Sequence, residues 1–350
     1  MEDVVIAGVG LTTAVGLSAP ETAAAVRAAM MRFEPIAYHD RQFQPFTVAQ
    51  VPEDGLPPLA PALASLRLTP RVARMLRLAT APLAECVAAL PATERKPPLV
   101  LALPETETTL PMDGAAFLAA LAAQTDGAFE PAGSDASRRG RAGGLAAVGA
   151  AVQAVRSGRL RFALAGGVET YRDLHVLGTL DRDRRVKSAA NPDGFIPGEG
   201  AAFLLVTTRG AAQAAGLAPL ASLAAAAEAV EPGHLHSAEP YRGDGLAAAV
   251  AGALAQARPR TAVREVYSTM NGESHWAKEW GVAFLRSHGG IASDHGMHHP
   301  ADCYGDPGAA AGPLLVALAA LGLRGGYRQA PSLVYASSDA GPRAALVLDV

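Results

Sequence analysis

Short apolar strands alternate with longer helical segments along this chain of 350 residues, and this alternation constrains the fold more than any other feature. Strands are predicted at residues 4–7, 98–103, 161–165, 201–207, 221–227, 264–268 and 344–350. Helices are predicted at residues 20–30, 114–123, 144–156, 245–257 and 309–323. This order predicts an α/β protein in which sheets and helices form separate layers.

Glycine-rich segments are expected to end or weaken several strands. Residues 8–13 (GVGLTT) are predicted to form a turn, and Gly166 and Gly167 are predicted to stop the strand at 161–165. Residues 129–140 (FEPAGSDASRRG) combine proline, glycine and charge, so a poor strand is expected there.

Composition excludes several classes of function. Half of the residues are apolar and the net charge is only -3, so the chain is globular and nothing favours nucleic acid or an anionic membrane surface. No apolar run reaches the roughly 18 residues that span a bilayer, and the acidic, strand-like start MEDVVIAGVG differs from a signal peptide. The only two cysteines, Cys86 and Cys303, fit a reducing compartment without a disulfide framework. We therefore expect a cytoplasmic protein, with Cys86 in its core.

Three motifs stand out in order along the chain. They are VVIAGVGLTTAVG at residues 4–16, ALAGGVET at 163–170 and DGFIPGEGAAFLLV at 193–206. Together they resemble the β-ketoacyl-[acyl carrier protein] synthases of the thiolase superfamily. The residues expected to shape the backbone are Gly166, Gly167, Asp193, Gly194, Pro197, Gly198, Glu199 and Gly200. The glycines suit a chain that turns and packs closely, and Glu199 is expected to bind nearby amide groups.

This resemblance implies a thiolase-like fold of five layers, α/β/α/β/α, with two pseudo-repeated halves. The halves would be residues 1–210 and 211–350, joined in one compact body. The chain is shorter than a typical synthase, and the deficit falls before Arg141, where the family has an interface strand. Because residues 129–140 are expected to make a poor strand, the family's two-fold dimer is not carried over, and a homodimer or heterodimer stays open.

The same resemblance places non-catalytic residue types at the family's catalytic positions. Counting back from Gly166 puts Arg141 at the nucleophilic cysteine. Asn271 falls in the loop that carries the family's first catalytic histidine, and Asp306 or its neighbour falls at the position of the second. The family also has a catalytic lysine near the second histidine, but no lysine follows Lys278 here. A thiolate must accept the acyl chain and two histidines must polarise the thioester. Since a guanidinium stays protonated and cannot accept an acyl group, the resemblance predicts a catalytically inactive protein.

Arg141 and Cys303 each allow more than one interpretation. Arg141 could hold a carboxylate or phosphate ligand, pair internally with Asp306, or turn to the surface; a cation at a helix N-terminus needs an anion nearby. Cys303 could be a displaced nucleophile, but no histidine relay is evident, so a structural thiol is favoured.

Other polar residues have plain interpretations. Residues 294–303 (DHGMHHPADC) resemble a zinc-ligand set, but the spacing fits no helix-borne pair, so an irregular polar loop and no metal are predicted. His234 and His236 are assigned to a turn, and Ser134 and Ser137 to a solvated loop. Trp276 and Trp280 are four residues apart, so they share a helix face that is either core or a partner site.

Three functions remain open, and none needs a cofactor. The first is a binding or adaptor protein; LDRDRRVKS (residues 180–188) with residues 193–206 also resembles thiolase-like accessory proteins of type VI secretion, which implies effector loading and an effector or chaperone as partner. The second is a divergent acyltransferase, a 3-oxoacyl-acyl carrier protein synthase built around Cys303, Asn271 and Asp306. The third is a chain-length-factor-like subunit that pairs with an active synthase, and acyl carrier protein is a further candidate partner.

Overall fold

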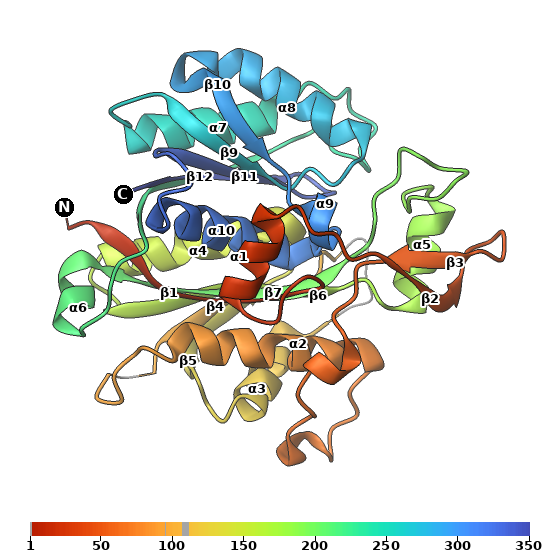
Figure 1. Cartoon of the computed structure of the whole chain (residues 1–350), viewed down its shortest axis with the longest axis horizontal. Helices are drawn as coiled ribbons and strands as arrows, with labels where there is room; N and C mark the ends of the chain where they lie inside the picture. The colour runs from red at the N-terminus through yellow and green to blue at the C-terminus, as the bar shows by residue number, and fades with distance from the viewer. Residues whose placement is uncertain (1, 95, 107–111) are drawn as a thin grey trace.

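The computed structural model describes residues 2–94, 96–106 and 112–350, and Figure 1 shows their layered arrangement. The strands are β1 (Val4–Thr13), β2 (Glu34–His39), β3 (Pro45–Val48), β4 (Pro98–Ala102), β5 (Glu130–Ser137), β6 (Phe162–Thr170), β7 (Glu199–Thr208), β8 (Ala221–Val230), β9 (Val263–Ser268), β10 (Ile291–His298), β11 (Ser332–Ser337) and β12 (Pro342–Asp349). The α-helices are α1 (Ala19–Arg27), α2 (Pro70–Val87), α3 (Gly114–Gln124), α4 (Gly140–Arg156), α5 (Leu174–Arg182), α6 (Arg209–Ala214), α7 (Asp244–Ala257), α8 (Ser274–Ser287), α9 (Ala301–Tyr304) and α10 (Ala311–Arg324).

In the described part of the chain, ten strands form two five-stranded halves that meet at their edges. The order is β10-β9-β11-β12-β8-β1-β7-β6-β4-β5, with β2 and β3 in a separate hairpin. β1 and β8 join the halves through only two pairs, Val5 with Ser222 and Ile6 with Ala221. The first half therefore uses strands from before residue 210, and the second half uses strands from after it.

Helices fill the space between the halves and cover both outer faces (Figure 1). α4 and α10 lie in the middle, α2 and α3 cover the first half, and α7 and α8 cover the second. The two middle helices are close because their contact residues are small: a Cβ on Gly144 would lie 2.4 Å from Pro313 Cδ. α10 is buried nearly all round, which is why its sequence is apolar on every side.

Two predicted glycine breaks are wrong. β1 continues through residues 8–13, and β6 continues through Gly166 and Gly167 to Thr170. A Cβ on Gly10 would lie 1.8 Å from Pro82 O of α2, and one on Gly167 would lie 2.2 Å from Ala309 O. These glycines let other backbone segments approach the strands, so they mark close packing and not chain reversal.

Two segments, one expected to be a poor strand and one an irregular loop, contain edge strands. β5 lies within residues 129–140 and pairs in parallel with β4, while β10 overlaps the loop predicted at residues 294–303 and pairs in parallel with β9. An edge position tolerates Pro131 and Gly133, because a strand with one neighbour has fewer ladder hydrogen bonds to lose. The expectations of a poor strand and of an irregular histidine loop were therefore wrong, since pairing with a neighbouring strand outweighed local propensity.

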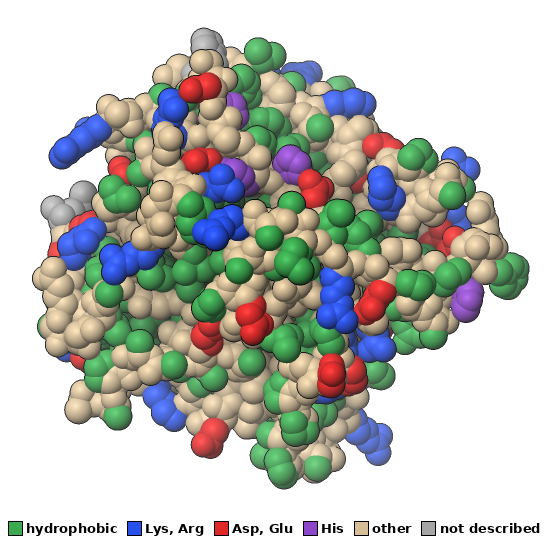
Figure 2. All heavy atoms as spheres, viewed as in Figure 1, with side chains coloured by type: hydrophobic (Ala, Val, Ile, Leu, Met, Phe, Trp, Pro, Cys, Tyr) green, Lys and Arg blue, Asp and Glu red, His purple; other side chains and the backbone are tan. Residues whose placement is uncertain are grey.

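The described helices include none that combines the length and apolarity needed to cross a membrane. On the face seen in Figure 2, acidic and basic side chains are interspersed without a large region of one sign.

Candidate functional site

The three residues singled out at the family's catalytic positions meet at the N-terminus of α4. Arg141 is the second residue of this helix, Asn271 follows β9, and Asp306 follows α9. Arg141 Nη1 donates to Asp306 Oδ2 at 2.8 Å, and Asn271 Nδ2 donates to the same oxygen at 2.8 Å. Of the three interpretations of Arg141, the structure forms the internal pair with Asp306.

Further charged residues close this pair into a ring of side chains. Arg141 Nη2 donates to Asp339, which follows β11, and Asp339 also binds Arg185. Arg185 makes a two-point contact with Glu273, with both N–O distances 2.8 Å. Asn271 Nδ2 lies 3.1 Å from Glu273 Oε2 and so links Glu273 back to Asp306. Loops from both halves of the molecule thus hold one another through a closed polar ring.

The backbone at the start of α4 is built around this ring. Gly140 has φ +61°, which favours glycine, and its position leaves room for Glu105: a Cβ there would lie 2.7 Å from Glu105 Oε2. Ser338 Oγ accepts from Ala142 N at 2.9 Å and satisfies one of the amide groups that a helix start leaves without a partner. The helix dipole disfavours a cation here by roughly 0.3–1 kcal/mol, and the aspartates at Arg141 offset this cost.

The ring is almost entirely shielded from solvent. Arg141 is 2% exposed, Asp306 1%, Asp339 3%, and Asn271 and Glu273 9% each. The face of Trp276 lies over Arg141, with the guanidinium carbon 4.8 Å from the ring centroid, and its Nε1 donates to Glu273 at 2.9 Å. Neither Arg141, Asn271 nor Asp306 lines the cavities of about 460, 430, 670, 240 and 410 Å³ found elsewhere in the molecule.

Charge pairing decides the protonation of the ring. Burial opposes the charge of Arg141, but Asp339 and Asp306 outweigh it and raise its pKa well above the ordinary value. Burial likewise opposes the charge of Asp339, but Arg141 and Arg185 hold its pKa well below the ordinary value. Glu105 differs: burial and the nearby Asp339 raise its pKa to about 7, although it accepts amide hydrogens from Asp339 and Ala340. Arg141 and Asp339 are thus a charged pair, and Glu105 titrates near neutrality.

The glycine motif at residues 193–206 contacts the segments that pack beside the ring. Glu199 Oε1 accepts from Val51 N at 2.7 Å, which confirms the expected amide contact. Its main partner is the buried Arg74, which contacts both carboxylate oxygens. Gly198 N donates to Asp306 O at 2.9 Å, so the motif also fixes the backbone of a ring residue. Asp193 accepts from Ser274 N at 2.8 Å at the start of α8.

Gly194 and Gly200 permit close approaches between backbones. A Cβ on Gly194 would lie 2.4 Å from Val186 C, and one on Gly200 would lie 2.6 Å from Thr12 O. Pro197 O accepts from Ala49 N at 2.8 Å.

The remaining candidate residues lie outside the ring. Cys303 is 6% exposed on α9, and burial raises the pKa of its thiol. His298 binds Glu265 across β10 and β9 at 2.6 Å. Within the described ranges, no group of three or more His, Cys, Asp or Glu side chains is arranged to hold a metal ion. Ser134 and Ser137 belong to β5, and their predicted loop is wrong.

The aromatic pair on α8 packs inward. Trp276 is 3% exposed, and Trp280 stacks on Tyr335 with ring centroids 4.7 Å apart. The core interpretation of this helix face is confirmed.

Sequence reasoning did not assign a role to several members of the ring. Arg185, Glu273 and Asp339 lie in turn-rich segments whose partners are distant in sequence; Arg141 and Asp339 are 198 positions apart. One signal was present for Asp339. The segment SLVYASSDAG is an apolar strand followed by a polar turn, the position where open α/β sheets collect functional side chains.

Comparisons with known proteins identify the fold. Residues 140–212 match the family model for the N-terminal domain of β-ketoacyl synthases, and no curated protein matches the chain. The ishigamide ketosynthase/chain length factor structure is 19% identical with a TM-score of 0.79, and the match covers 100% of this chain and 99% of that chain. The chain has the ketosynthase fold.

Other solved structures share this fold at lower identity. The type II PKS acyl-carrier protein in complex with its ketosynthase (AntDE:AntF) is 16% identical with a TM-score of 0.81, and the match covers 100% of this chain and 99% of that chain. A ketosynthase from module 6 of the bacillaene synthase from Bacillus subtilis 168 is 14% identical with a TM-score of 0.79; the match covers 99% of this chain and 72% of that chain. The matched segment 140–212 of the ketosynthase-fold chain contains α4, β6, β7 and the glycine motif, so it includes Arg141 and Arg185.

Proposed function

We propose that this ketosynthase-fold protein does not catalyse condensation and acts by binding another protein, as a chain-length-factor-like subunit beside an active synthase. The observation that carries the proposal is the buried ring around Arg141. A guanidinium engaged by two carboxylates fills the helix start where a condensing enzyme needs a thiolate. Its neighbours are hydrogen-bonded to one another, so they are not arranged to receive a substrate carbonyl.

The competing acyltransferase would need another nucleophile. Cys303 is the alternative nucleophile that the sequence offers, but its thiol is buried and its pKa is raised, first by burial and then by Asp302. A thiol with a raised pKa forms less thiolate at neutral pH and reacts more slowly. This observation favours the binding role over a displaced catalytic centre.

The edge strand β5 supports a synthase subunit as the partner. β5 is last in the strand order, and most of its residues are exposed. Ala136 N donates to Asp135 Oδ1 at 2.9 Å, and Ala132 N donates to Glu130 Oε1 at 3.1 Å, so local carboxylates satisfy amide groups near this edge. A partner strand could replace these contacts with a backbone ladder. Two of the similar structures are a ketosynthase/chain length factor and an acyl-carrier protein in complex with its ketosynthase.

The first experiment tests the absence of catalysis. The purified protein is incubated with acetyl and malonyl thioesters of coenzyme A and of acyl carrier protein, and intact-mass spectrometry follows covalent acyl-protein. We expect no adduct in the wild type. A stoichiometric adduct, or release of carbon dioxide from the malonyl thioester by the protein alone, would refute the proposal.

The second experiment tests the partner. A ketosynthase from the same genome is co-expressed, and the complex is measured by light scattering after size-exclusion chromatography. Ala132→Pro removes an amide group of β5, and Ala132→Ser retains it as the matched control. We expect a one-to-one complex that Ala132→Pro weakens at least tenfold and Ala132→Ser does not. Failure to bind any co-expressed synthase, together with stoichiometric binding of a secretion effector or its chaperone, would replace the synthase role with the adaptor role.

A further inference from the structure

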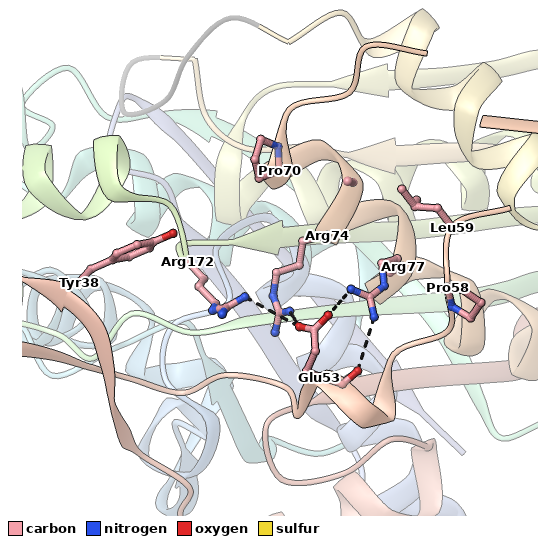
Figure 3. A pocket seen from close by; sticks show the side chains of 9 residues that line it. Tyr38, Glu53, Pro58, Leu59, Pro70, Arg74, Arg77 and Arg172 are labelled. Atoms are coloured by element: carbon pink, nitrogen blue, oxygen red, sulfur yellow. Dashed lines mark hydrogen bonds and ion pairs between the residues drawn. The ribbon is translucent and has the colours of Figure 1, made fainter. Parts of the chain in front are cut away.

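A cavity of about 460 Å³ lies beside the N-terminal half of α2, and no residue of the Arg141 ring lines it. Figure 3 shows three arginine side chains turning into it from two elements toward one carboxylate. Arg74 and Arg77 come from α2, Arg172 follows β6, and Glu53 lies on a single 3-10 turn, Glu53–Gly55. Cavities of this size commonly hold small organic molecules.

The charges of this cavity are not balanced. Arg74 contacts both oxygens of the buried Glu199 behind the cavity wall, so its charge has a partner of its own. Arg77 and Arg172 then share Glu53, although Arg172 Nη1 is 3.9 Å from the carboxylate. That contact is the one ion pair that Arg172 makes within the described part of the chain, and its side chain is 40% exposed. One positive charge therefore faces the cavity without a matching anion.

The arginines are held in place by groups other than Glu53. Arg77 Nε donates to Pro57 O at 2.7 Å, and Arg74 Nη2 donates to Val51 O at 2.8 Å. Glu53 itself is 62% exposed, and rotation of its side chain would move the carboxylate into solvent. The guanidinium groups would then keep their positions, with one Nη1 of each left to donate to another anion. Such a prearranged set of donors reduces the entropy lost on binding.

The carboxylate of Glu53 lies between two guanidinium groups. Its Oε2 accepts from Arg74 Nη1 at 2.7 Å, and its Oε1 accepts from Arg77 Nη1. The hydrogen bond from Arg77 holds the pKa of Glu53 below its ordinary value, so the carboxylate is charged at neutral pH. Two oxygens about a planar or tetrahedral centre, as in a carboxylate or phosphate, match two guanidinium donors.

We propose that this arginine cavity binds a small organic oxyanion, preferentially a phosphate monoester, which displaces the side chain of Glu53. The apolar part of the ligand would contact the remaining wall, formed by Tyr38, Pro58, Leu59, Pro70 and Ala73. A dianion is preferred because, once Glu53 is displaced, Arg77 and Arg172 face the cavity without a matching anion, whereas Arg74 stays paired with Glu199. The inference is independent of the proposed partner function, since no residue of the cavity belongs to the Arg141 ring or to β5.

Binding is tested by isothermal titration calorimetry with phenyl phosphate as the probe. Three compounds separate the contributions to binding. Benzoate lacks the second charge, benzyl alcohol lacks the charged head, and inorganic phosphate lacks the ring. We expect a Kd of about 1 mM for phenyl phosphate, in keeping with a ligand of its size. Benzoate and inorganic phosphate should bind at least fivefold more weakly, and the neutral alcohol should not bind.

Variants identify the site and the displacement. Glu53→Gln removes the competing charge and should tighten binding at least fivefold, whereas Arg172→Gln should weaken it at least fivefold. Arg209→Gln is the matched control, because Arg209 is 39% exposed and pairs with Asp3 far from the cavity. Thermal melting verifies that each variant is folded. The inference is wrong if wild type and Glu53→Gln both fail to bind at 10 mM, if Arg172→Gln binds as tightly as wild type, or if Glu53→Gln binds more weakly.

Discussion

Replacing Arg141 by methionine tests the electrostatic account of the buried ring most directly. Methionine retains much of the side-chain volume but leaves Asp306 and Asp339 with fewer compensating charges inside the protein. Breaking a buried ion pair by removing one partner costs about 3–5 kcal/mol. The contact with Trp276 is lost as well, so the upper part of this range is expected.

The cost converts into a measurable shift of the melting temperature. An unfolding entropy of about 2.1 cal/mol/K per residue corresponds to about 0.7 kcal/mol/K for a chain of 350 residues. The range of about 3–5 kcal/mol corresponds to a decrease in melting temperature of about 4–7 °C, and Arg141→Met should fall in the upper part of this interval. Differential scanning calorimetry measures this shift, and tryptophan fluorescence gives an independent transition because Trp276 and Trp280 are the only tryptophans.

A matched variant and a rescue make the test specific. Arg209→Met removes an exposed pair with Asp3 and should cost less than about 1 kcal/mol, a shift of about 1 °C. Arg141→Met combined with Asp306→Asn removes both charges of one pair and should recover part of the loss. A decrease below about 1.5 °C for Arg141→Met alone would show that the ring contributes little to stability, and the electrostatic reasoning would be refuted.

Three further predictions concern protonation, packing and thiol reactivity. Because the pKa of Glu105 in the folded protein is raised to about 7, its stabilising contribution is present at acidic pH and is lost as the pH rises through 7. Glu105→Gln should therefore flatten the fall in melting temperature between pH 5 and 8. An unchanged profile of melting temperature against pH would contradict this prediction. Gly167→Ala should destabilise the protein by about 1–3 kcal/mol in chemical denaturation, because its Cβ would lie 2.2 Å from Ala309 O. Gly178→Ala, on an open helix face, is the control and should be neutral or stabilising by up to about 1 kcal/mol. Equal effects of the two substitutions would exclude the packing explanation. Cys303 should resist a thiol reagent in the native protein and react after denaturation, and rapid native labelling would return it to consideration as a nucleophile.

The sequence predicted much of the fold because local patterns repeat where elements are long. The helix expected at residues 144–156 is part of α4, and the strand expected at 201–207 is part of β7. The predictions were wrong at glycines that lie inside strands and at edge strands whose composition is typical of loops. Gly10 and Gly167 read as breaks in sequence, yet they lie inside strands because another backbone packs on them. β5 has a loop-like composition and becomes a strand only through pairing with β4.

The candidate site was also predicted only in part from the sequence. The sequence and its resemblance placed Arg141, and no cysteine, at the start of a helix; they also placed Asn271 in a loop after a strand and Asp306 or its neighbour in the loop before the alanine-rich helix. Folding was needed to show that Arg185, Glu273 and Asp339 complete the ring, and that two arginines of α2 and one after β6 face the carboxylate of Glu53. An ion pair depends on distance in space, whereas the charges concerned are separated by up to 198 positions along the chain. Local pattern fixes which face of an element is apolar, but the partner of a buried charge is chosen when distant loops pack together.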